Sequence, residues 1–294
     1  PWQPTVGELP RRGVDLELTL DRSIQALAEE ELKQAIWEHE AEGGTIIVME
    51  PETFGILAMA SYPAYDPERY AEYGDQDPPP YEDPAVSKQY EPGSGFKILT
   101  AAAALDTGIV TPETTYTDEG WIEVGGQTIR NATGKAYGVM SVTDVLVKSL
   151  NVGAAWLSRQ MGPDVFYGYL DDFGIGERTD VDLAGEVAGQ LWLPEDVEHW
   201  HPSNQGTNSF GQGVAVTPLQ MVTAVATVAN DGVRLRPHVV DRRIAPDGTV
   251  SVYQPVMVER VISPETAHTL TEMLVQAVEE GITLAKVDGY RVAG

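Results

Sequence analysis

The first sixty residues alternate between the hydrophobic period of a strand and that of a helix. Leucines alternate with polar residues over positions 16–20, which predicts a short strand. Asp21 follows as a helix cap, and apolar residues then recur every three or four positions, which predicts an amphipathic helix over residues 22–43. We expect the glycine pair at 43–44 to end this helix.

Two almost wholly apolar runs, residues 45–49 and 56–60, come next and are joined by a turn sequence of hairpin length. A strand that is apolar on both faces has to be covered on both. We therefore predict an antiparallel hairpin at the centre of a sheet, with helices on either side and the 22–43 helix as one of them. The proline-rich residues 61–92, which include Pro78-Pro79-Pro80, are predicted to form a long surface connection.

Residues 93–230 have a mainly helical pattern. Ser141 stands three residues before an aspartate, which is capping-box spacing, and Thr217 precedes a proline suited to a first helical position. Helices are predicted at residues 94–107, 142–160, 164–173 and 217–230.

After this region the chain returns to short alternating stretches. Two strands and a helix are predicted at residues 239–244, 249–253 and 264–279. The layout predicts one interleaved domain over residues 15–294. Residues 15–92 and 231–294 are expected to form an α/β lobe, residues 93–230 a mainly helical lobe, and a cleft is expected between them.

The composition is that of a folded protein with a strongly acidic surface. The 294 residues are 42% hydrophobic and 22% charged, and 19 Lys and Arg against 45 Asp and Glu give a net charge of −26. Such a surface repels phosphate backbones and anionic lipid head groups, so no nucleic-acid partner is expected. The sequence has no cysteine, which excludes disulfides, thiolate metal sites and thiol nucleophiles.

The N-terminal residues 1–14 are rich in proline and glycine and are predicted to be a linker from a region that precedes this sequence. They do not have the pattern of a signal peptide. No apolar run approaches the about 20 residues that a membrane helix needs. We therefore expect any anchor or export signal of the natural protein to lie outside these residues.

Chemistry is most strongly indicated by Ser94 and Lys97, which follow a Pro-Gly breaker and open a run that is otherwise apolar on every side. The two residues are three apart, hence adjacent on one helical face. A desolvated lysine amine beside a serine hydroxyl is a general base beside a nucleophile. Taken alone, the pair is equally compatible with a helix-capping Ser94 and a Lys97 that extends into solvent.

A second candidate group is Ser149 and Asn151, where a hydroxyl and an amide could relay a proton and hold a peptide carbonyl. Ordinary helix-end polarity would also explain them. A third is the Ser-Phe-Gly-Gln-Gly run at 209–213, whose glycines suggest tight backbone beside a site, although packing would explain them as well. His199 and His201 have no third ligand at metal-binding spacing, so no metal site is expected.

In order and spacing these segments resemble the transpeptidase domain of class B penicillin-binding proteins. The resemblance rests on residues 91–97, 149–151 and 209–213, and extends to 19–25 and 57–63. Ser-x-x-Lys and a Ser-x-Asn triplet belong to the signature of that superfamily. The resemblance implies the α+β fold of penicillin-binding proteins and β-lactamases, in which an antiparallel sheet is covered by helices and a mainly helical lobe is added.

The resemblance also implies an activity, namely a serine acyltransferase that cross-links peptidoglycan stem peptides at D-Ala-D-Ala. Ser94 would be the nucleophile and Lys97 would take its proton. Ser149 would relay protons to the leaving and entering amines, and Asn151 would bind the substrate amide. The backbone N–H of Ser94 would form half of the oxyanion hole.

Further expectations follow from the same resemblance. Gly211 and Gln212 become candidate substrate-binding residues, β-lactams become ligands that acylate Ser94, and no cofactor or metal is implied. The implied location is the extracytoplasmic face of a bacterial membrane, with a membrane glycosyltransferase and other wall-synthesis proteins as partners.

The sequence departs from the family in two places. Gly95 stands where the family usually has threonine. The chain ends at Val292-Ala293-Gly294, where the family continues into Lys-Thr-Gly and further strands. We expect those C-terminal strands to be missing here, and the 294-residue chain alone to be acylated slowly or not at all.

Two other functions stay open at this stage. A β-lactam-hydrolysing or β-lactam-sensing relative shares the motifs, but a lactamase needs a deacylating carboxylate, and residues 177–205 do not obviously supply one. The other alternative is a non-catalytic fragment or scaffold of a transpeptidase.

Overall fold

In the computed structural model, which describes residues 12–73 and 81–294, the chain opens with strand β1 (Asp15–Leu18) and helix α1 (Arg22–Glu38). The predicted cap is confirmed, because the Asp21 carboxylate accepts hydrogen bonds from the backbone N–H groups of Ser23 and Ile24 at 2.8 and 3.0 Å. The linker expected over residues 1–14 lies, up to residue 11, outside the described residues.

Helix α1 ends five residues earlier than predicted. Glu40 adopts a left-handed conformation (φ 50°), and the N–H of Ala41 bonds back to the carbonyl of Ile36 at 3.0 Å. This Schellman turn ends the helix without a glycine. Gly43 instead permits a close approach, because a Cβ there would lie 2.8 Å from the carbonyl oxygen of Tyr62.

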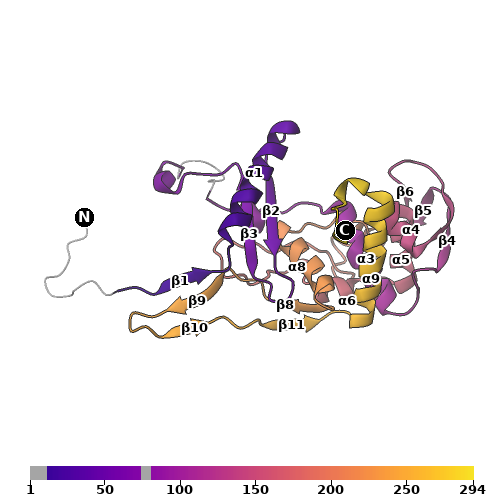
Figure 1. The fold of residues 1–294 in the computed structure, drawn as a ribbon. Helices are drawn as coiled ribbons and strands as arrows, with labels where there is room; N and C mark the ends of the chain where they lie inside the picture. The colour runs from indigo at the N-terminus through magenta and orange to yellow at the C-terminus, as the bar shows by residue number, and fades with distance from the viewer. Residues whose placement is uncertain (1–11, 74–80) are drawn as a thin grey trace.

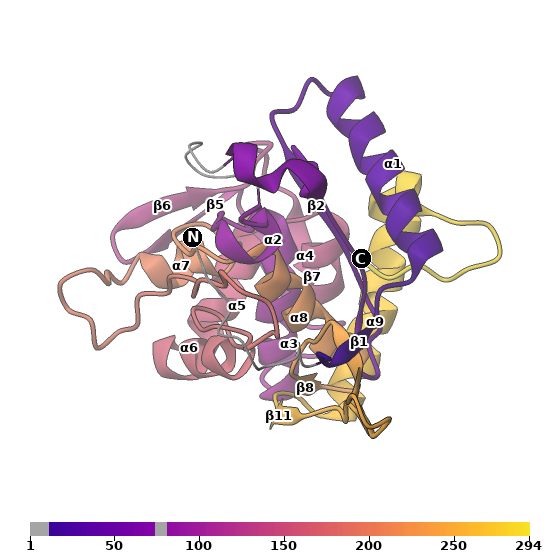
Figure 2. The same ribbon diagram turned by 90° about the vertical axis from the view of Figure 1, so that its left-hand side faces the viewer.

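The predicted hairpin is confirmed: β2 (Gly44–Met49) pairs antiparallel with β3 (Ile56–Tyr62). Helix α1 covers one face, where Leu32 and Ile36 pack on Ala58 and Ala60. The other face packs on helices α2 and α8, and the views show α1 and α8 on opposite sides of the hairpin (Figures 1 and 2). Within the described residues the hairpin is a two-stranded sheet rather than the centre of a larger one.

The predicted surface connection after the hairpin contains regular structure. A 3-10 segment η1 (Pro67–Tyr73) is followed by the short helix α2 (Pro84–Ser87), whose Ala85 and Val86 are buried against the hairpin. The proline at the first helical position lacks only an N–H that would have no helical partner. Asp83 caps the turn through the N–H of Ala85. The triplet Pro78-Pro79-Pro80 lies outside the described residues.

The next region is mainly helical, as predicted, but the helix expected over residues 142–160 is two helices separated at Ser149. Both predicted capping residues, Ser141 and Thr217, accept hydrogen bonds from the N–H three residues on. The elements are η2 (Gly93–Phe96), α3 (Lys97–Asp106), α4 (Val142–Val147), α5 (Asn151–Met161), α6 (Pro163–Asp172), α7 (Asn204–Asn208) and α8 (Pro218–Ala229).

Four short strands within this region were not predicted. They form two antiparallel pairs, β4 with β7 and β5 with β6, at the end of the molecule away from β1 (Figure 1). Each has only four residues, too few for an alternating pattern to stand out. Their bounds are β4 (Thr115–Asp118), β5 (Trp121–Val124), β6 (Gln127–Arg130) and β7 (Gly138–Ser141).

The C-terminal part returns to strands and one helix. The two predicted strands are present as β9 (Val240–Ile244) and β10 (Val250–Val252), and β1 pairs with β9, which joins the start of the described chain to this part. Helix α9 (Pro264–Gln276) continues into a π turn (Ala277–Gly281) and a 3-10 turn (Thr283–Ala285). Strands β8 (Val233–Leu235) and β11 (Met257–Arg260), which pair with each other, were not predicted.

Helix α3 lies at the centre of the main core. Its residues 99–104 are fully buried, and α5, α6, α8 and α9 pack around it. The all-round apolar pattern that predicted a buried helix is thereby confirmed. The architecture is α+β, as expected. None of the helices in the described residues is both long and apolar enough to cross a membrane.

Candidate active site

The structure brings Ser94 and Lys97 together as their spacing predicts. Ser94 lies in the 3-10 turn η2, Lys97 begins α3, and the Lys97 Nζ is 3.0 Å from the Ser94 Oγ. The Ser94 residue is exposed, whereas Lys97 is only 2% exposed. The arrangement leaves a hydroxyl open to solvent with a buried amine beneath it, so the alternative in which Lys97 extends into solvent is wrong.

Lys97 reaches two further acceptors, both from Ser149. Its Nζ lies 2.8 Å from the Ser149 carbonyl oxygen and 2.9 Å from the Ser149 Oγ. All three partners are uncharged, and in the described part of the chain no carboxylate lies within ion-pair distance of this amine. Burial without a counter-charge disfavours the ammonium form, and this desolvation lowers the pKa of Lys97 to about 8.

Ser149 owes its place to the end of helix α4. It adopts a left-handed conformation (φ 52°), and the N–H groups of Ser149 and Leu150 bond to the carbonyls of Leu146 and Val145 at 3.1 and 2.9 Å. This is a Schellman turn with serine at the position that glycine usually fills. The turn points both the carbonyl and the hydroxyl of one residue at Lys97.

Asn151 is the first residue of α5. Its side-chain Nδ2 donates to the carbonyl oxygen of Arg130 at 3.2 Å, so strand β6 holds the amide from behind. The break between α4 and α5 thus sets Ser149 and Asn151 on either side of the buried Leu150. The sequence predicts one helix across both residues, because residues 147–151 contain no glycine or proline that would mark the break.

Gly211 packs directly on the turn that carries Ser94. The N–H of Gly93 donates to the Gly211 carbonyl at 3.0 Å, and a Cβ on Gly211, which has φ 74°, would collide with the backbone of Gly93. The hydroxyl of Thr100 in α3 bonds the Ser209 carbonyl at 2.7 Å. Gln212 is exposed, and its side chain makes no hydrogen bond to the residues that the structure describes.

Sequence reasoning missed a second buried polar group, formed by Asp118 at the end of β4 and Asn131 just after β6. They are 1% and 5% exposed, and Asn131 bonds to the backbone of α5 next to the candidate site. Their only sequence signal is a short alternation over 115–118, inside a region whose pattern predicts mainly helices.

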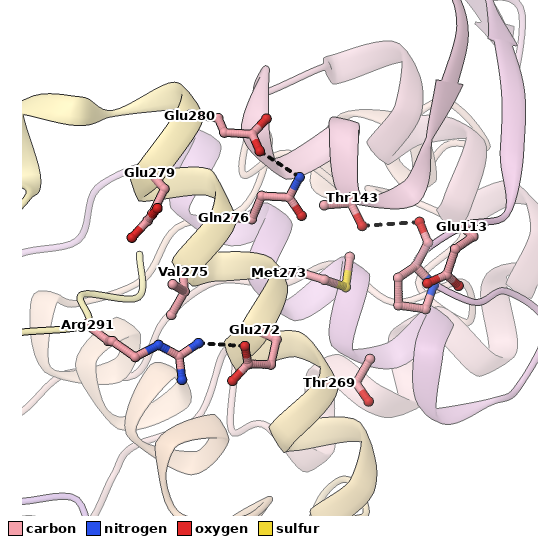
Figure 3. Close-up of a pocket in the computed structure, with 11 residues that line it drawn as sticks. Glu113, Thr143, Thr269, Glu272, Met273, Val275, Gln276, Glu279, Glu280 and Arg291 are labelled. Carbon is pink, nitrogen blue, oxygen red and sulfur yellow. Dashed lines mark hydrogen bonds and ion pairs between the residues drawn. The ribbon is translucent and has the colours of Figure 1, made fainter.

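A cavity of about 620 Å³ lies elsewhere, between α9 and the start of α4 (Figure 3). Four glutamates, including Glu272 and Glu280, line it, and Arg291 pairs with Glu272 at 2.6 Å. That ion pair lowers the pKa of Glu272. Neither Ser94, Lys97 nor Ser149 borders this cavity, so it is separate from the candidate site.

One of the two histidines considered for a metal site, His199, makes local side-chain contacts. His199 pairs with Asp196 at 3.0 Å and stacks on Trp192 with ring centres 4.3 Å apart. Across residues 12–73 and 81–294, no three metal-ligating side chains come together in a way that could hold an ion.

An exposed serine hydroxyl that touches a buried amine of lowered pKa, itself held by a second serine, has the arrangement of a nucleophile beside a general base. Residues 44–294 match the penicillin binding protein transpeptidase domain family, and the chain belongs to it.

Individual relatives agree with this assignment. The chain is 37% identical to penicillin-binding protein PbpB of Mycolicibacterium smegmatis over 290 residues, covering 96% of this chain and 44% of that protein. It is 37% identical to stage V sporulation protein D of Bacillus subtilis, covering 97% of this chain and 44% of that protein. The chain therefore spans less than half the length of these two relatives.

A solved structure of high similarity is penicillin-binding protein 3 of Mycobacterium tuberculosis in its apo form. It superposes with a TM-score of 0.90 at 34% identity, covering 98% of this chain and 66% of that one. The same protein has been solved in complex with aztreonam and with ampicillin, at TM-scores of 0.85 and 0.86. The expected fold of penicillin-binding proteins is confirmed.

Proposed function

We propose that the natural protein is a D,D-transpeptidase that cross-links peptidoglycan stem peptides through an acyl-enzyme on Ser94. The observation that carries the proposal is the contact between the exposed Ser94 hydroxyl and the buried Lys97 amine at 3.0 Å. Membership of the transpeptidase family supports the reaction class. A relative 33% identical to this chain, from Neisseria flavescens, is named a probable peptidoglycan D,D-transpeptidase.

Lys97 acts as the general base in this proposal. A pKa of about 8 leaves roughly one tenth of the amine neutral at pH 7. An ordinary lysine, with a pKa near 10.4, would be neutral in only about one molecule in several thousand. The neutral amine accepts the Ser94 proton while its two remaining N–H groups donate to the carbonyl and the hydroxyl of Ser149.

The first half-reaction forms an ester. Ser94 Oγ attacks the carbonyl carbon of the penultimate D-Ala, and its proton passes to Lys97. The tetrahedral intermediate then collapses, the C–N bond breaks, and the terminal D-Ala leaves as an amine. Ser149 bridges Lys97 and the leaving nitrogen, so the proton removed from Ser94 returns to that amine.

The second half-reaction reverses the proton path. An amine of a neighbouring stem peptide attacks the ester, gives a proton through Ser149 to Lys97, and Ser94 is released with its hydroxyl restored. Asn151 would hold the substrate amide, and the N–H of Ser94, close to the positive end of a helix, would stabilise the developing oxyanion. Gly211 and Gln212 remain proposed substrate-binding residues. Gly211 accepts a hydrogen bond from the backbone of the turn that carries Ser94, and the Gln212 side chain is exposed, where a ligand could contact it.

β-Lactams would enter the same path at its first step. The strained amide would acylate Ser94, and the resulting ester would be slow to hydrolyse. The mycobacterial relative solved with aztreonam and with ampicillin supports this ligand class.

The location and partners of the natural protein follow from its substrate. Peptidoglycan lies outside the cytoplasm, so we infer that the domain works at the extracytoplasmic face of the bacterial membrane. A membrane glycosyltransferase that makes the glycan strands, together with other wall-synthesis proteins, is the expected set of partners.

The test is covalent labelling of the natural full-length protein with a fluorescent penicillin. We expect one label per chain, lost in Ser94→Ala and retained in Ser209→Ala, since the Ser209 hydroxyl is buried and bonded to the Gly206 carbonyl at 2.6 Å. Labelling of Ser94→Ala equal to that of the parent would refute the assignment. Rapid multiple turnover of a chromogenic cephalosporin would instead identify a β-lactamase.

A further inference from the structure

A buried carboxylate lies outside the cluster of Ser94, Lys97 and Ser149. Asp118 is 1% exposed, and both of its oxygens accept from the Asn131 Nδ2 at 3.0 Å. The Gly120 N–H and the Tyr116 hydroxyl donate to it at 2.8 and 3.2 Å, and the Tyr137 N–H at 3.4 Å. No arginine or lysine of the described chain lies within ion-pair distance of Asp118. Such a carboxylate is costly to bury, and its neighbours are all hydrogen-bond donors.

The carboxylate determines which way the Asn131 amide faces. Both Asp118 oxygens accept from the Asn131 NH₂ group, which therefore points toward the carboxylate, and the same group also reaches the Lys135 carbonyl at 3.2 Å. The Asn131 Oδ1 then faces α5, where it accepts from the Val152 N–H at 3.1 Å.

This contact supplies a helix cap from outside the helix. The N-cap residue of α5 is Leu150, which has no polar side chain, so the first N–H groups of α5 have no local acceptor. Asn131 takes the place of a capping side chain at Val152. The preceding residue, Arg130, accepts from the Asn151 Nδ2 at 3.2 Å. The last residue of β6 and the residue after it therefore hold two consecutive residues at the start of α5.

The packing around this anchor is tight. The Tyr116 ring stacks on Trp156 of α5 with ring centres 5.2 Å apart. Gly153 leaves room for Tyr116, because a Cβ at that position would lie 2.5 Å from the Tyr116 hydroxyl oxygen. The start of α5 is thus bound to β4 on one side and to the end of β6 on the other.

We propose that Asn131, oriented by Asp118, is a positioning residue that anchors the start of α5 and thereby holds Ser149 against Lys97 and Asn151 toward the substrate. This inference rests on the proposed transpeptidase function. Ser149 is in a left-handed turn that a serine adopts at a cost, so it needs support on both sides. Helix α4 supplies one side through the Schellman turn, and the Asn131 cap supplies the other.

Loss of the cap would release the turn. The two contacts from Lys97 to Ser149 would lengthen and water would reach the amine. The acylation rate would then fall for two reasons, a misplaced proton relay and a Lys97 pKa closer to that of an ordinary lysine.

The experiment measures the acylation rate of the natural full-length protein by a fluorescent penicillin as a function of pH. Asn131→Ala and Asn131→Asp are each expected to lower the rate about 10²-fold, since misplacement by about 1 Å is enough for that loss. The pH at which the rate reaches half of its maximum should move upward from about 8 in both variants. Thr128→Ala is the matched control, because Thr128 is an exposed residue of β6 whose side chain makes no hydrogen bond to the described residues.

A charge swap separates positioning from simple destabilisation. Asn131→Asp alone sets two carboxylates against each other, whereas Asn131→Asp combined with Asp118→Asn restores one donor and one acceptor and still offers an oxygen to Val152. We expect the double variant to recover at least about tenfold of the rate lost in Asn131→Asp and to bring the pH midpoint back toward that of the parent.

Several results would overturn the inference. Asn131→Ala with the rate and pH midpoint of the parent would do so. So would a rate loss with an unchanged midpoint, or a swap that recovers the melting temperature without the rate. Failure of the parent protein itself to label at Ser94 would refute the proposed function instead, so the two failures are distinguishable.

Discussion

One lysine and one aspartate are buried in the helical region, and their surroundings are of opposite kinds. Asp118 is surrounded by donors, namely an amide, a hydroxyl and backbone N–H groups, which all donate to its two carboxylate oxygens. Lys97 meets a carbonyl and two hydroxyls, which accept its hydrogen bonds but bring no negative charge. The surroundings of Asp118 favour stability, and in the proposed function those of Lys97 favour reactivity.

A buried charge that stabilises the fold differs from a reactive one in the partners that surround it. A buried charge with a full set of complementary dipoles is a scaffold element, and removing it leaves its partners unsatisfied. A buried charge whose partners compensate it only in part is kept near its titration point and can exchange a proton. The scaffold element here bonds to the helix that follows Ser149, so the two buried groups are linked in one structure.

The largest effect is expected from removing the reactive member. Lys97→Ala should lower the rate of Ser94 acylation by about 10³-fold, because the hydroxyl loses its general base. The rate is measured with a fluorescent penicillin at neutral pH. Lys33→Ala is the control, since it removes an exposed cation from α1 and should acylate like the parent. Equal rates for the two variants would show that Lys97 is not the base.

Removing Asp118 should lower the stability of the fold. Asp118→Ala leaves the Asn131 amide and the Tyr116 hydroxyl without their acceptor, which should lower the free energy of unfolding by roughly 1–3 kcal/mol for each of the two groups. Urea unfolding followed by far-UV circular dichroism measures this. Asp171→Ala, at an exposed position of α6, should change it by less than about 0.5 kcal/mol. If Asp118→Ala lowers the free energy of unfolding no more than Asp171→Ala does, the hydrogen bonds of Asp118 do not stabilise the fold.

Of the two buried charged residues, the sequence predicted Lys97 but not Asp118. Lys97 is a single charge in an apolar run, and its spacing puts it on the same helical face as Ser94, although taken alone this is equally compatible with a Lys97 that extends into solvent. Asp118 and Asn131 lie in short strands and loops without a repeating pattern, and their partners are distant in sequence. The hairpin and its covering helix were predicted because their apolar periods are long and local. The break at Ser149 was not, because a non-glycine residue in a left-handed turn has no sequence signature.

The comparison can be sharpened through pH. The pKa of Lys97 falls from about 10.5 when unfolded to about 8 when folded, so the unfolded chain binds more protons between these values and stability rises with pH across that window. The gain for the parent protein should approach about 3 kcal/mol.

Lys97→Met, which fills similar space without a charge, should lose this rise and be at least as stable as the parent at neutral pH. Urea unfolding at neutral and at alkaline pH measures both effects. A Met variant with the same pH dependence of stability as the parent would show that another group is responsible.

Acylation of the parent should increase about tenfold per pH unit below a pH of about 8, since the neutral amine is the reactive form.

The smallest effect tests the turn that serves Lys97. Ser149 and Glu40 occupy the same left-handed position of two Schellman turns, with φ 52° and 50°. Glycine adopts this conformation without strain, so Ser149→Gly and Glu40→Gly should each raise the free energy of unfolding by about 0.5–1 kcal/mol. Only Ser149→Gly should lower acylation, because it removes the hydroxyl that lies 2.9 Å from Lys97. If both variants are more stable and only Ser149→Gly loses acylation activity, the serine at position 149 serves the reaction rather than the stability of the turn. If Ser149→Gly acylated like the parent, the hydroxyl would have no part in the proton path, and the Ser149 carbonyl would be the only contact that Lys97 needs there.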